Sequence, residues 1–423
     1  MHSCWSKAGI VALLIVVLLG VGCNDVYRPI VTPVPLPGGD PGTTDYVAVL
    51  NSNPSGAQDV VTFINVSGDT NVGNRLVGPG AAWLAWDGAR TSTVVPNTGL
   101  NTVSQVTYSS TAVTTASLYP GSQPTYTFSR NTSNAYVLNQ GKNTQCPSSG
   151  SIGVLLSTNN SLQSNICVGP HPVYFTQTSD GSRLIILDDN LSEAWIFNLN
   201  TNAFEAKLPV GSNPVWALVS PDNNTAFVLN QGSNDITVID IPNSAVRTAS
   251  VPTNGSSPSF MAIDSRRLRL YVTNQASATV SSFDITGGNP VTLHAPVSMG
   301  SGTAPRALAV LPDGSAVFVA NTATNFVTRM DANSFLTTPI PVSDSAGATV
   351  TWVAASLGGS KVYASFVEPT NINNGTTIIR TIDNGIGATL PAPRQDVASC
   401  DPTVSSTPCS TLRMRPTQVA SRQ

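Results

Sequence analysis

The stretch "LYVTNQASATVSSFDI", residues 270–285, shows a pattern that recurs along the chain. It contains an apolar strand that ends in Asn, a polar turn, and a second strand that ends in Asp. "AFVLNQGSNDITVIDI", residues 226–241, and "VFVANTATNFVTRMDA", residues 317–332, repeat it. Runs of Val, Ile, Thr and aromatic residues between turn residues are typical of β-strands in hairpins. The pattern therefore predicts a repeated β unit.

The Asn-ending strand occurs eight times, with its central residue 42 to 49 positions from the next. The third residue after the central one is Asn or Asp in every unit except the last, where it is Phe366. Five of the units are preceded by Gly-x-x-Pro and a short apolar strand. A period of roughly 40 to 50 residues that contains about four strands is typical of a propeller blade. The central residues are Ala48, Val94, Tyr136, Ile185, Phe227, Tyr271, Phe318 and Tyr363.

The recurring Asn and Asp residues are interpreted as turn formers. Their side chains accept hydrogen bonds from nearby backbone N–H groups and tolerate left-handed backbone angles, so they close strands well. A catalytic group is rarely repeated in every blade. We therefore expect these residues to be structural.

"LYVTN", "PDGSAVFVANT" and "TVIDIPNSAVRTASVP" resemble the YVTN-family β-propeller repeat. The resemblance covers nearly everything after Asp45 and is closest over residues 169–321. It implies a propeller, usually of seven blades, on an exported or surface protein, often without a known reaction.

We predict an all-β fold, a β-propeller of four-stranded antiparallel blades, over residues 46–423. Its first strand, residues 46–51, is already of the Asn-ending type, so the first blade lacks a preceding strand. "RPTQVAS", residues 415–421, has a Pro followed by alternating apolar residues. We expect this C-terminal strand to complete the first blade, because an unpaired edge invites aggregation. The count is then eight blades, with seven as the alternative.

The N-terminus resembles a bacterial lipoprotein signal. A lysine precedes the apolar run of residues 9–22, which is shorter than the roughly 20 apolar residues of a spanning helix. "LGVGC" resembles a lipobox, although Gly20 stands where Leu is usual. We predict a signal peptide over residues 1–22, lipidation at Cys23, and a Pro-rich tether over residues 23–45. A plain secretory signal with a free Cys23 thiol is the alternative.

The cysteine count supports export. Of six cysteines, one lies in the signal and four form two local pairs, which leaves Cys23 alone. We predict disulfides between Cys146 and Cys167 and between Cys400 and Cys409, in an oxidising compartment. The expected location is the bacterial cell envelope, at the outer membrane or facing the periplasm, with the lipid as the membrane contact.

Few residues offer catalytic or cofactor chemistry. The net charge of −3 gives no basic stripe for nucleic acid, and no phosphate loop or dinucleotide fingerprint occurs.

Outside the signal the only histidines are His171 and His294, too few for a His-rich copper centre. His171 is interpreted as a turn residue. "LDDN", residues 187–190, offers oxygens for Ca²⁺ without EF-hand spacing. We predict no catalytic residue, metal site or cofactor.

These observations favour an envelope-anchored, monomeric, non-catalytic binding or scaffold protein that recognises a protein, peptide or glycan. The alternative is a propeller enzyme of the lactonase-like hydrolase type, because that class shares related repeats. An acidic or metal cluster at the mouth of the central channel would favour the enzyme.

Overall fold

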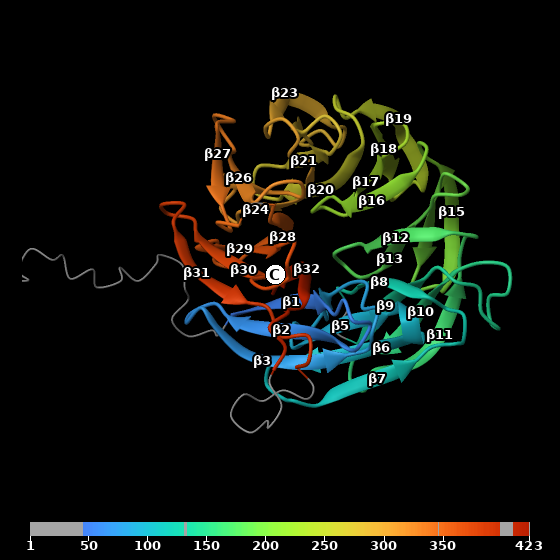
Figure 1. Ribbon diagram of the computed structural model, residues 1–423. Helices are drawn as coiled ribbons and strands as arrows, with labels where there is room; N and C mark the ends of the chain where they lie inside the picture. Colours follow the sequence, from blue (N-terminus) through green and yellow to red (C-terminus); the bar gives the residue numbers. More distant parts are fainter. Residues whose placement is uncertain (1–44, 131–132, 346, 398–408, 423) are drawn as a thin grey trace, which may run out of the picture. The chain divides into compact units, whose positions relative to one another are not determined.

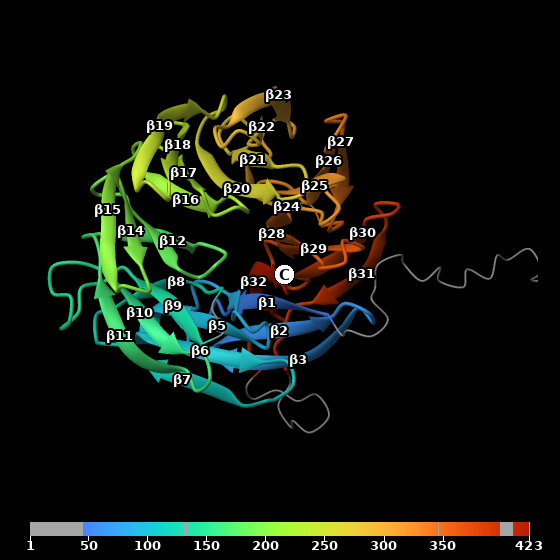
Figure 2. The same ribbon diagram turned by 180° about the vertical axis from the view of Figure 1, so that it is seen from behind.

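The computed structural model describes residues 45–130, 133–345, 347–397 and 409–422. Within them the strands form eight separate four-stranded sheets. Figures 1 and 2 show the sheets following one another around a ring, from blue through green to red, and returning to the first. The all-β, eight-bladed propeller predicted from the repeat is therefore confirmed, and the alternative of seven blades is wrong.

Each blade runs from an innermost strand near the axis to an outermost strand (Figure 1). From the innermost strand outward, blade 1 is β32 (Arg415–Ser421), β1 (Tyr46–Ser52), β2 (Asp59–Asn65) and β3 (Thr70–Val77); blade 2 is β4 (Ala85–Trp86), β5 (Ser92–Asn97), β6 (Thr102–Thr107) and β7 (Val113–Ser117); blade 3 is β8 (Pro124–Phe128), β9 (Asn134–Asn139), β10 (Ser151–Leu156) and β11 (Ser161–Cys167); blade 4 is β12 (Pro172–Gln177), β13 (Arg183–Asp188), β14 (Glu193–Asn198) and β15 (Ala203–Pro209).

The second half of the ring repeats the arrangement. Blade 5 is β16 (Pro214–Val219), β17 (Thr225–Asn230), β18 (Asp235–Asp240) and β19 (Ala245–Pro252); blade 6 is β20 (Pro258–Asp264), β21 (Arg269–Asn274), β22 (Thr279–Asp284) and β23 (Val291–Ser298); blade 7 is β24 (Pro305–Val310), β25 (Ala316–Asn321), β26 (Phe326–Asp331) and β27 (Thr337–Pro341); blade 8 is β28 (Thr349–Ala355), β29 (Lys361–Val367), β30 (Gly375–Arg380) and β31 (Ile386–Pro391). A short 3-10 turn, η2 (Thr98–Leu100), follows β5.

The hydrophobic core lies between adjacent blades. All six residues of β5, β17 and β25 are buried, because the middle strands pack against neighbouring blades on both faces. This double burial explains why the Asn-ending strands are continuous apolar runs in the sequence. Their central aromatic residues Phe227, Tyr271, Phe318 and Tyr363 are all fully buried.

The Gly-x-x-Pro motif marks the start of the innermost strand, as expected. Five innermost strands, in blades 3 to 7, begin at the Pro of the motif. Blade 2 has Ala81 in place of the motif Pro. Its innermost strand is short, Ala85–Trp86, and Ala81 makes an isolated bridge to Asn97.

The recurring Asn side chains differ from expectation. In blades 2, 5, 6 and 7 the Asn at the end of the second strand donates from Nδ2 to a Ser or Thr hydroxyl in the third strand, over 2.8 to 3.0 Å. These amides are fully buried, so they join two strands and do not form turns. The expected turn role belongs to the Asp that ends the third strand: Asp240 Oδ1 accepts the Asn243 N–H, and Asp284 Oδ1 accepts the Thr286 N–H.

The C-terminal strand closes the ring, as predicted. β32 pairs antiparallel with β1, from Ser421 opposite Val47 to Arg415 opposite Ser52. It also joins blade 1 to blade 2. The Leu84 N–H donates to Gln418 Oε1 at 2.7 Å, and Trp86 Nε1 donates to the Ala420 carbonyl at 3.1 Å.

One predicted disulfide is present. Cys146, in the loop after β9, is bonded to Cys167 at the end of β11. Cys409 is also disulfide-bonded, and its predicted partner Cys400 lies outside the described residues. The bond at Cys146 closes a local loop within blade 3.

Removing the Cys146–Cys167 bond should lower the free energy of unfolding by about 3 kcal/mol, since a sequence separation of 21 leaves a long unfolded loop unconstrained. The measurement is urea unfolding of the Cys146→Ser, Cys167→Ser double variant beside the parent. Replacing both residues avoids a free thiol that could form a wrong pair. A change of less than about 1 kcal/mol would contradict the expected contribution.

The signal peptide, Cys23 and nearly all of the Pro-rich tether lie outside the described residues. In the described part of the chain, no helix has the length and apolar character needed to cross a membrane.

Candidate functional site

An aromatic layer crosses the ring axis. The second residue after the Pro of the Gly-x-x-Pro motif, or after the residue in its place, is aromatic in blades 2 to 6 and in blade 8. It is Ala307 in blade 7 and, counted from Pro416, Gln418 in blade 1. The six rings form a closed circuit in which neighbouring centroids lie 4.2 to 5.6 Å apart. Such ring pairs stabilise a protein core by more than the burial of their apolar area alone. We call this circuit the aromatic layer; it consists of Trp83, Tyr126, Tyr174, Trp216, Phe260 and Trp352.

The two tyrosines of the layer are held neutral. Tyr126 Oη donates to Tyr174 Oη at 3.1 Å inside the protein. Burial raises the pKa of both phenols. They therefore act as uncharged hydrogen-bonding groups within the aromatic layer.

Two cavities adjoin the aromatic layer. One, of about 420 Å³, is lined by residues near the starts of the innermost strands, and we call it the Gln-rim cavity. The other, of about 590 Å³, is lined by residues at the ends of the same strands, and we call it the Ser-rim cavity. Trp216, Phe260 and Trp352 line both. The layer thus lies between two cavities with different chemistry.

The Gln-rim cavity combines an aromatic floor with amide groups. Gln140, Gln231 and Gln275 line it, and each directly follows the Asn that ends a second strand. Their backbone N–H groups donate to the carbonyl of the residue before the innermost strand, over 2.9 to 3.2 Å. Thr125 Oγ1, also in the lining, is buried and has no partner among the described residues. Side-chain amides and a hydroxyl can recognise ligand hydroxyls.

Arg306 is the single charged side chain among the described residues that line this cavity. It is exposed, and no carboxylate in the described part of the chain lies within ion-pair distance of it. The hydroxyls of Ser259 and Thr273 each donate to the backbone carbonyl of Arg306 over 3.3 Å. Neither contacts its guanidinium. A guanidinium in this position suits an anionic or carbonyl oxygen.

Blade 4 departs from the repeat at the position that carries Gln140, Gln231 and Gln275 in blades 3, 5 and 6. Asp189 takes the position of the rim glutamines, and its N–H points to the His171 carbonyl at 3.4 Å. Its Oδ1 lies 2.6 Å from His171 Nδ1. In blade 5 the equivalent pair is neutral, with Asn213 Nδ2 donating to Gln231 Oε1 at 3.2 Å. One blade therefore replaces an amide pair with an acid–base pair.

The backbone around His171 is fixed. Asp188 Oδ2 accepts the His171 N–H at 2.8 Å, and its Oδ1 accepts the Leu191 N–H at 2.9 Å. The side chain of His171 remains half exposed, and its ring contacts described residues by hydrogen bonding only through Nδ1. A carboxylate on Nδ1 orients an imidazole so that Nε2 can accept a proton. Val173 and Tyr174, two and three residues further along, line the Gln-rim cavity, whereas His171 and Asp189 themselves lie outside its lining.

One interpretation needs correction. His171 is not only a turn residue, because its ring is paired with Asp189. Of the oxygens considered for Ca²⁺ at residues 187–190, both of Asp188 accept N–H groups and Asp189 Oδ1 contacts His171. The described residues contain no group of three or more His, Cys, Asp or Glu that could hold a metal. Of the cysteines singled out in the sequence, Cys146 and Cys167 form a disulfide within blade 3, and neither lines the two cavities.

Comparison with known proteins finds similarity to a lactonase family model over part of the chain. The family model described as "Lactonase, 7-bladed beta-propeller" matches residues 169–355, less than half of the chain. That segment contains His171, Asp189 and Arg306. The chain has no match among curated proteins.

Solved structures show the same fold at low sequence identity. The periplasmic gluconolactonase PpgL of Pseudomonas aeruginosa has 16% identity and a TM-score of 0.53, with 70% of this chain and 95% of that chain covered. The dihydro-heme d1 dehydrogenase NirN has 12% identity and a TM-score of 0.66, covering 82% and 73%. Hydrazine synthase of Kuenenia stuttgartiensis has 17% identity and a TM-score of 0.54, covering 72% and 96%. The chain is therefore a β-propeller protein related in fold to enzymes of different chemistry.

Proposed function

We propose that the protein is a lactonase-like hydrolase that binds a polyhydroxylated lactone in the Gln-rim cavity. The observation that carries this proposal is the acid–base pair of His171 with Asp189. His171 directly precedes the strand whose Val173 and Tyr174 line an aromatic-floored cavity. The match of a lactonase family model to the segment that contains the pair supports it.

The cavity suits a compact, hydroxyl-rich ring. The apolar face of such a ring packs against aromatic side chains, here Trp83, Trp216 and Trp352. Its hydroxyls meet the amides of Gln140 and Gln275 at the edge. A volume of about 420 Å³ lies in the usual range of small-molecule sites.

The hydrolysis needs one water molecule and one base. His171 Nε2 removes a proton from the water, and the water oxygen attacks the lactone carbonyl carbon. The C–O bond of the lactone ring then breaks, and the proton passes from His171 to the departing alkoxide. Asp189 orients the imidazole and stabilises its cationic form. Arg306 neutralises the carboxylate of the hydroxy-acid product.

The direct test is acid release in a pH-stat with glucono-1,5-lactone and, for comparison, an unsubstituted aliphatic δ-lactone. We expect catalysed hydrolysis of the sugar lactone above the spontaneous rate and little acceleration of the aliphatic one, which lacks hydroxyls. No acceleration of any lactone would contradict the assignment.

A second candidate function is ligand binding without turnover on the cell envelope. It is favoured by the absence of carboxylates from the described lining of the Gln-rim cavity. Saturable binding of gluconate or a glycan, with no hydrolysis of any lactone, would support this candidate over the hydrolase.

We also propose that Cys23 is lipidated and anchors the propeller outside the cytoplasm. The disulfide between Cys146 and Cys167 supports an oxidising compartment. Replacing Cys23 by Ser should release the protein from the membrane fraction, because a lipid chain supplies the membrane affinity. Fractionation of cells that express the parent and the variant checks this. A variant that stays in the membrane fraction would contradict the anchor.

A further inference from the structure

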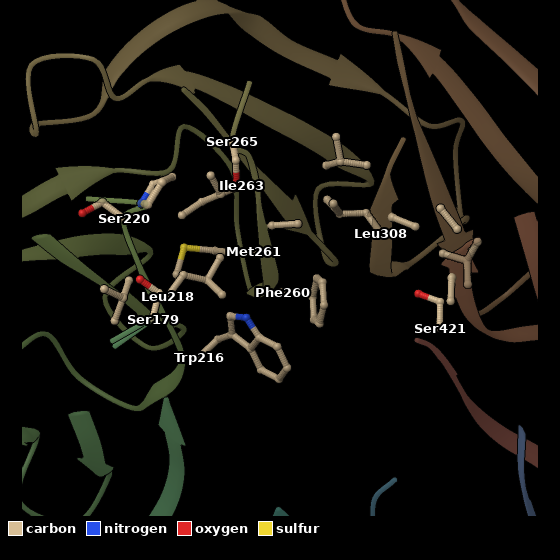
Figure 3. A pocket seen from close by; sticks show the side chains of 18 of the residues that line it. Ser179, Trp216, Leu218, Ser220, Phe260, Met261, Ile263, Ser265, Leu308 and Ser421 are labelled. Carbon is tan, nitrogen blue, oxygen red and sulfur yellow. The ribbon is translucent and has the colours of Figure 1, made fainter. Parts of the chain in front are cut away.

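The Ser-rim cavity has no part in the proposed hydrolysis. It lies on the other side of the aromatic layer, at the ends of the innermost strands. Figure 3 shows Leu218, Met261, Ile263 and Leu308 around one space, with Trp216 and Phe260 at its base. The walls are therefore mainly aliphatic. Serines at the rim, such as Ser220 and Ser265, supply the polar boundary.

Two hydrogen-bond donors in this lining have no acceptor among the described residues. Trp216 Nε1 is buried without a partner. In Figure 3 the nitrogen edge of the indole faces the side of Met261 and Phe260. A buried N–H without an acceptor is costly and is usually satisfied by a ligand or an ordered water.

Arg130 is the second donor and the single charged side chain in the described lining. Its guanidinium lies over the Phe128 ring, 5.6 Å from the ring centroid, and no described carboxylate lies within ion-pair distance of it. The side chain of Arg130 is exposed, and neighbouring protein atoms lower its pKa by partial desolvation. A guanidinium without a carboxylate partner favours an anionic ligand.

We propose that the Ser-rim cavity binds a monocarboxylate with an apolar body, its carboxylate held by Arg130 and Trp216 and its hydrocarbon part against Leu218, Met261 and Leu308. This site lies on the other side of the aromatic layer from the proposed hydrolase site and shares Trp216 with it. A neutral hydrocarbon would leave both donors unpaired, and a cationic amphiphile would be repelled by Arg130. The cavity volume of about 590 Å³ lies in the usual range of small-molecule sites and is too small for a folded protein domain.

The test is isothermal titration of the full protein with decanoate, below its micelle concentration, and with decyltrimethylammonium as the matched cation. We expect saturable binding of one decanoate and none of the cation. Arg130→Gln should weaken decanoate binding at least tenfold, and Trp216→Phe, which keeps the ring and removes the N–H, about threefold or more. Ile263→Trp, which fills the cavity, should abolish binding.

Arg306→Gln is the matched control on the other side of the aromatic layer, and it should leave decanoate binding unchanged. Circular dichroism of each variant checks that it is folded. The proposal is overturned if decanoate does not bind saturably, if folded Arg130→Gln and Ile263→Trp bind it as tightly as the parent, or if Arg306→Gln removes binding. Lactone hydrolysis is measured on the parent and on Arg130→Gln, because Arg130 lines only the Ser-rim cavity. Loss of decanoate binding with unchanged hydrolysis in that variant separates the two proposals.

Discussion

Removing residues 411–423 is expected to eliminate the folded monomer. The deletion takes away β32, which supplies the innermost strand of blade 1 and pairs with β1 along its length. It also removes Gln418 and Ala420, the acceptors for blade 2, and exposes the edge of β1. An unpaired apolar edge leads to association, so we expect the truncated chain to aggregate.

A matched pair of point variants separates this effect from simple truncation. Val419 is buried in β32, and Thr417 in the same strand is exposed. Val419→Asp should lower the free energy of unfolding by more than about 3 kcal/mol, because a charge enters the core. Thr417→Asp should change it by less than about 1 kcal/mol. Size-exclusion chromatography and thermal unfolding measure both. A truncated chain that stays monomeric and as heat-stable as the parent would show that the ring closes in another way.

Replacing His171 by Gln should reduce lactone hydrolysis by roughly 10²- to 10⁴-fold, the usual contribution of a general base. Glutamine keeps a polar side chain beside Asp189 and cannot take the proton. Binding of a lactone analogue should change little, since the aromatic floor and rim amides remain. Initial rates in the pH-stat, with tryptophan fluorescence for binding, give the two quantities separately.

Asn213→Ala is the control for His171→Gln, because Asn213 holds the equivalent position in blade 5 and bonds Gln231. It should alter the hydrolysis rate by less than about threefold, as a neutral amide supplies no proton acceptor. Equal losses in the two variants would mean that the rim geometry matters and the acid–base pair does not.

The repeat in the sequence was sufficient to predict the fold. Turn and strand residues recur at a spacing of 42 to 49 residues, so the number of blades and the closing role of residues 415–421 follow from alignment of the units. The role of the Asn residues did not follow, because a buried amide and a turn-forming amide look alike in one strand. Only the paired strand shows that Asn274 donates to Ser281.

The candidate site was missed for two physical reasons. The aromatic side chains of the layer come from different blades and meet only when the propeller closes. A signal was present in six blades, as an aromatic residue two positions after the motif Pro or the residue in its place. His171 and Asp189 are 18 residues apart and become neighbours through the pairing of β12 with β13. Comparison of the rim position across blades could have singled out Asp189, since it is acidic where three other blades have Gln.

A crystal structure of the protein with glucono-1,5-lactam, a stable analogue of the lactone, tests the central claim most directly. The account predicts the lactam ring in the Gln-rim cavity, packed on the aromatic layer, with its carbonyl facing a water bound to His171 Nε2. A lactam bound elsewhere, or an empty Gln-rim cavity at a lactam concentration that inhibits hydrolysis completely, would contradict it.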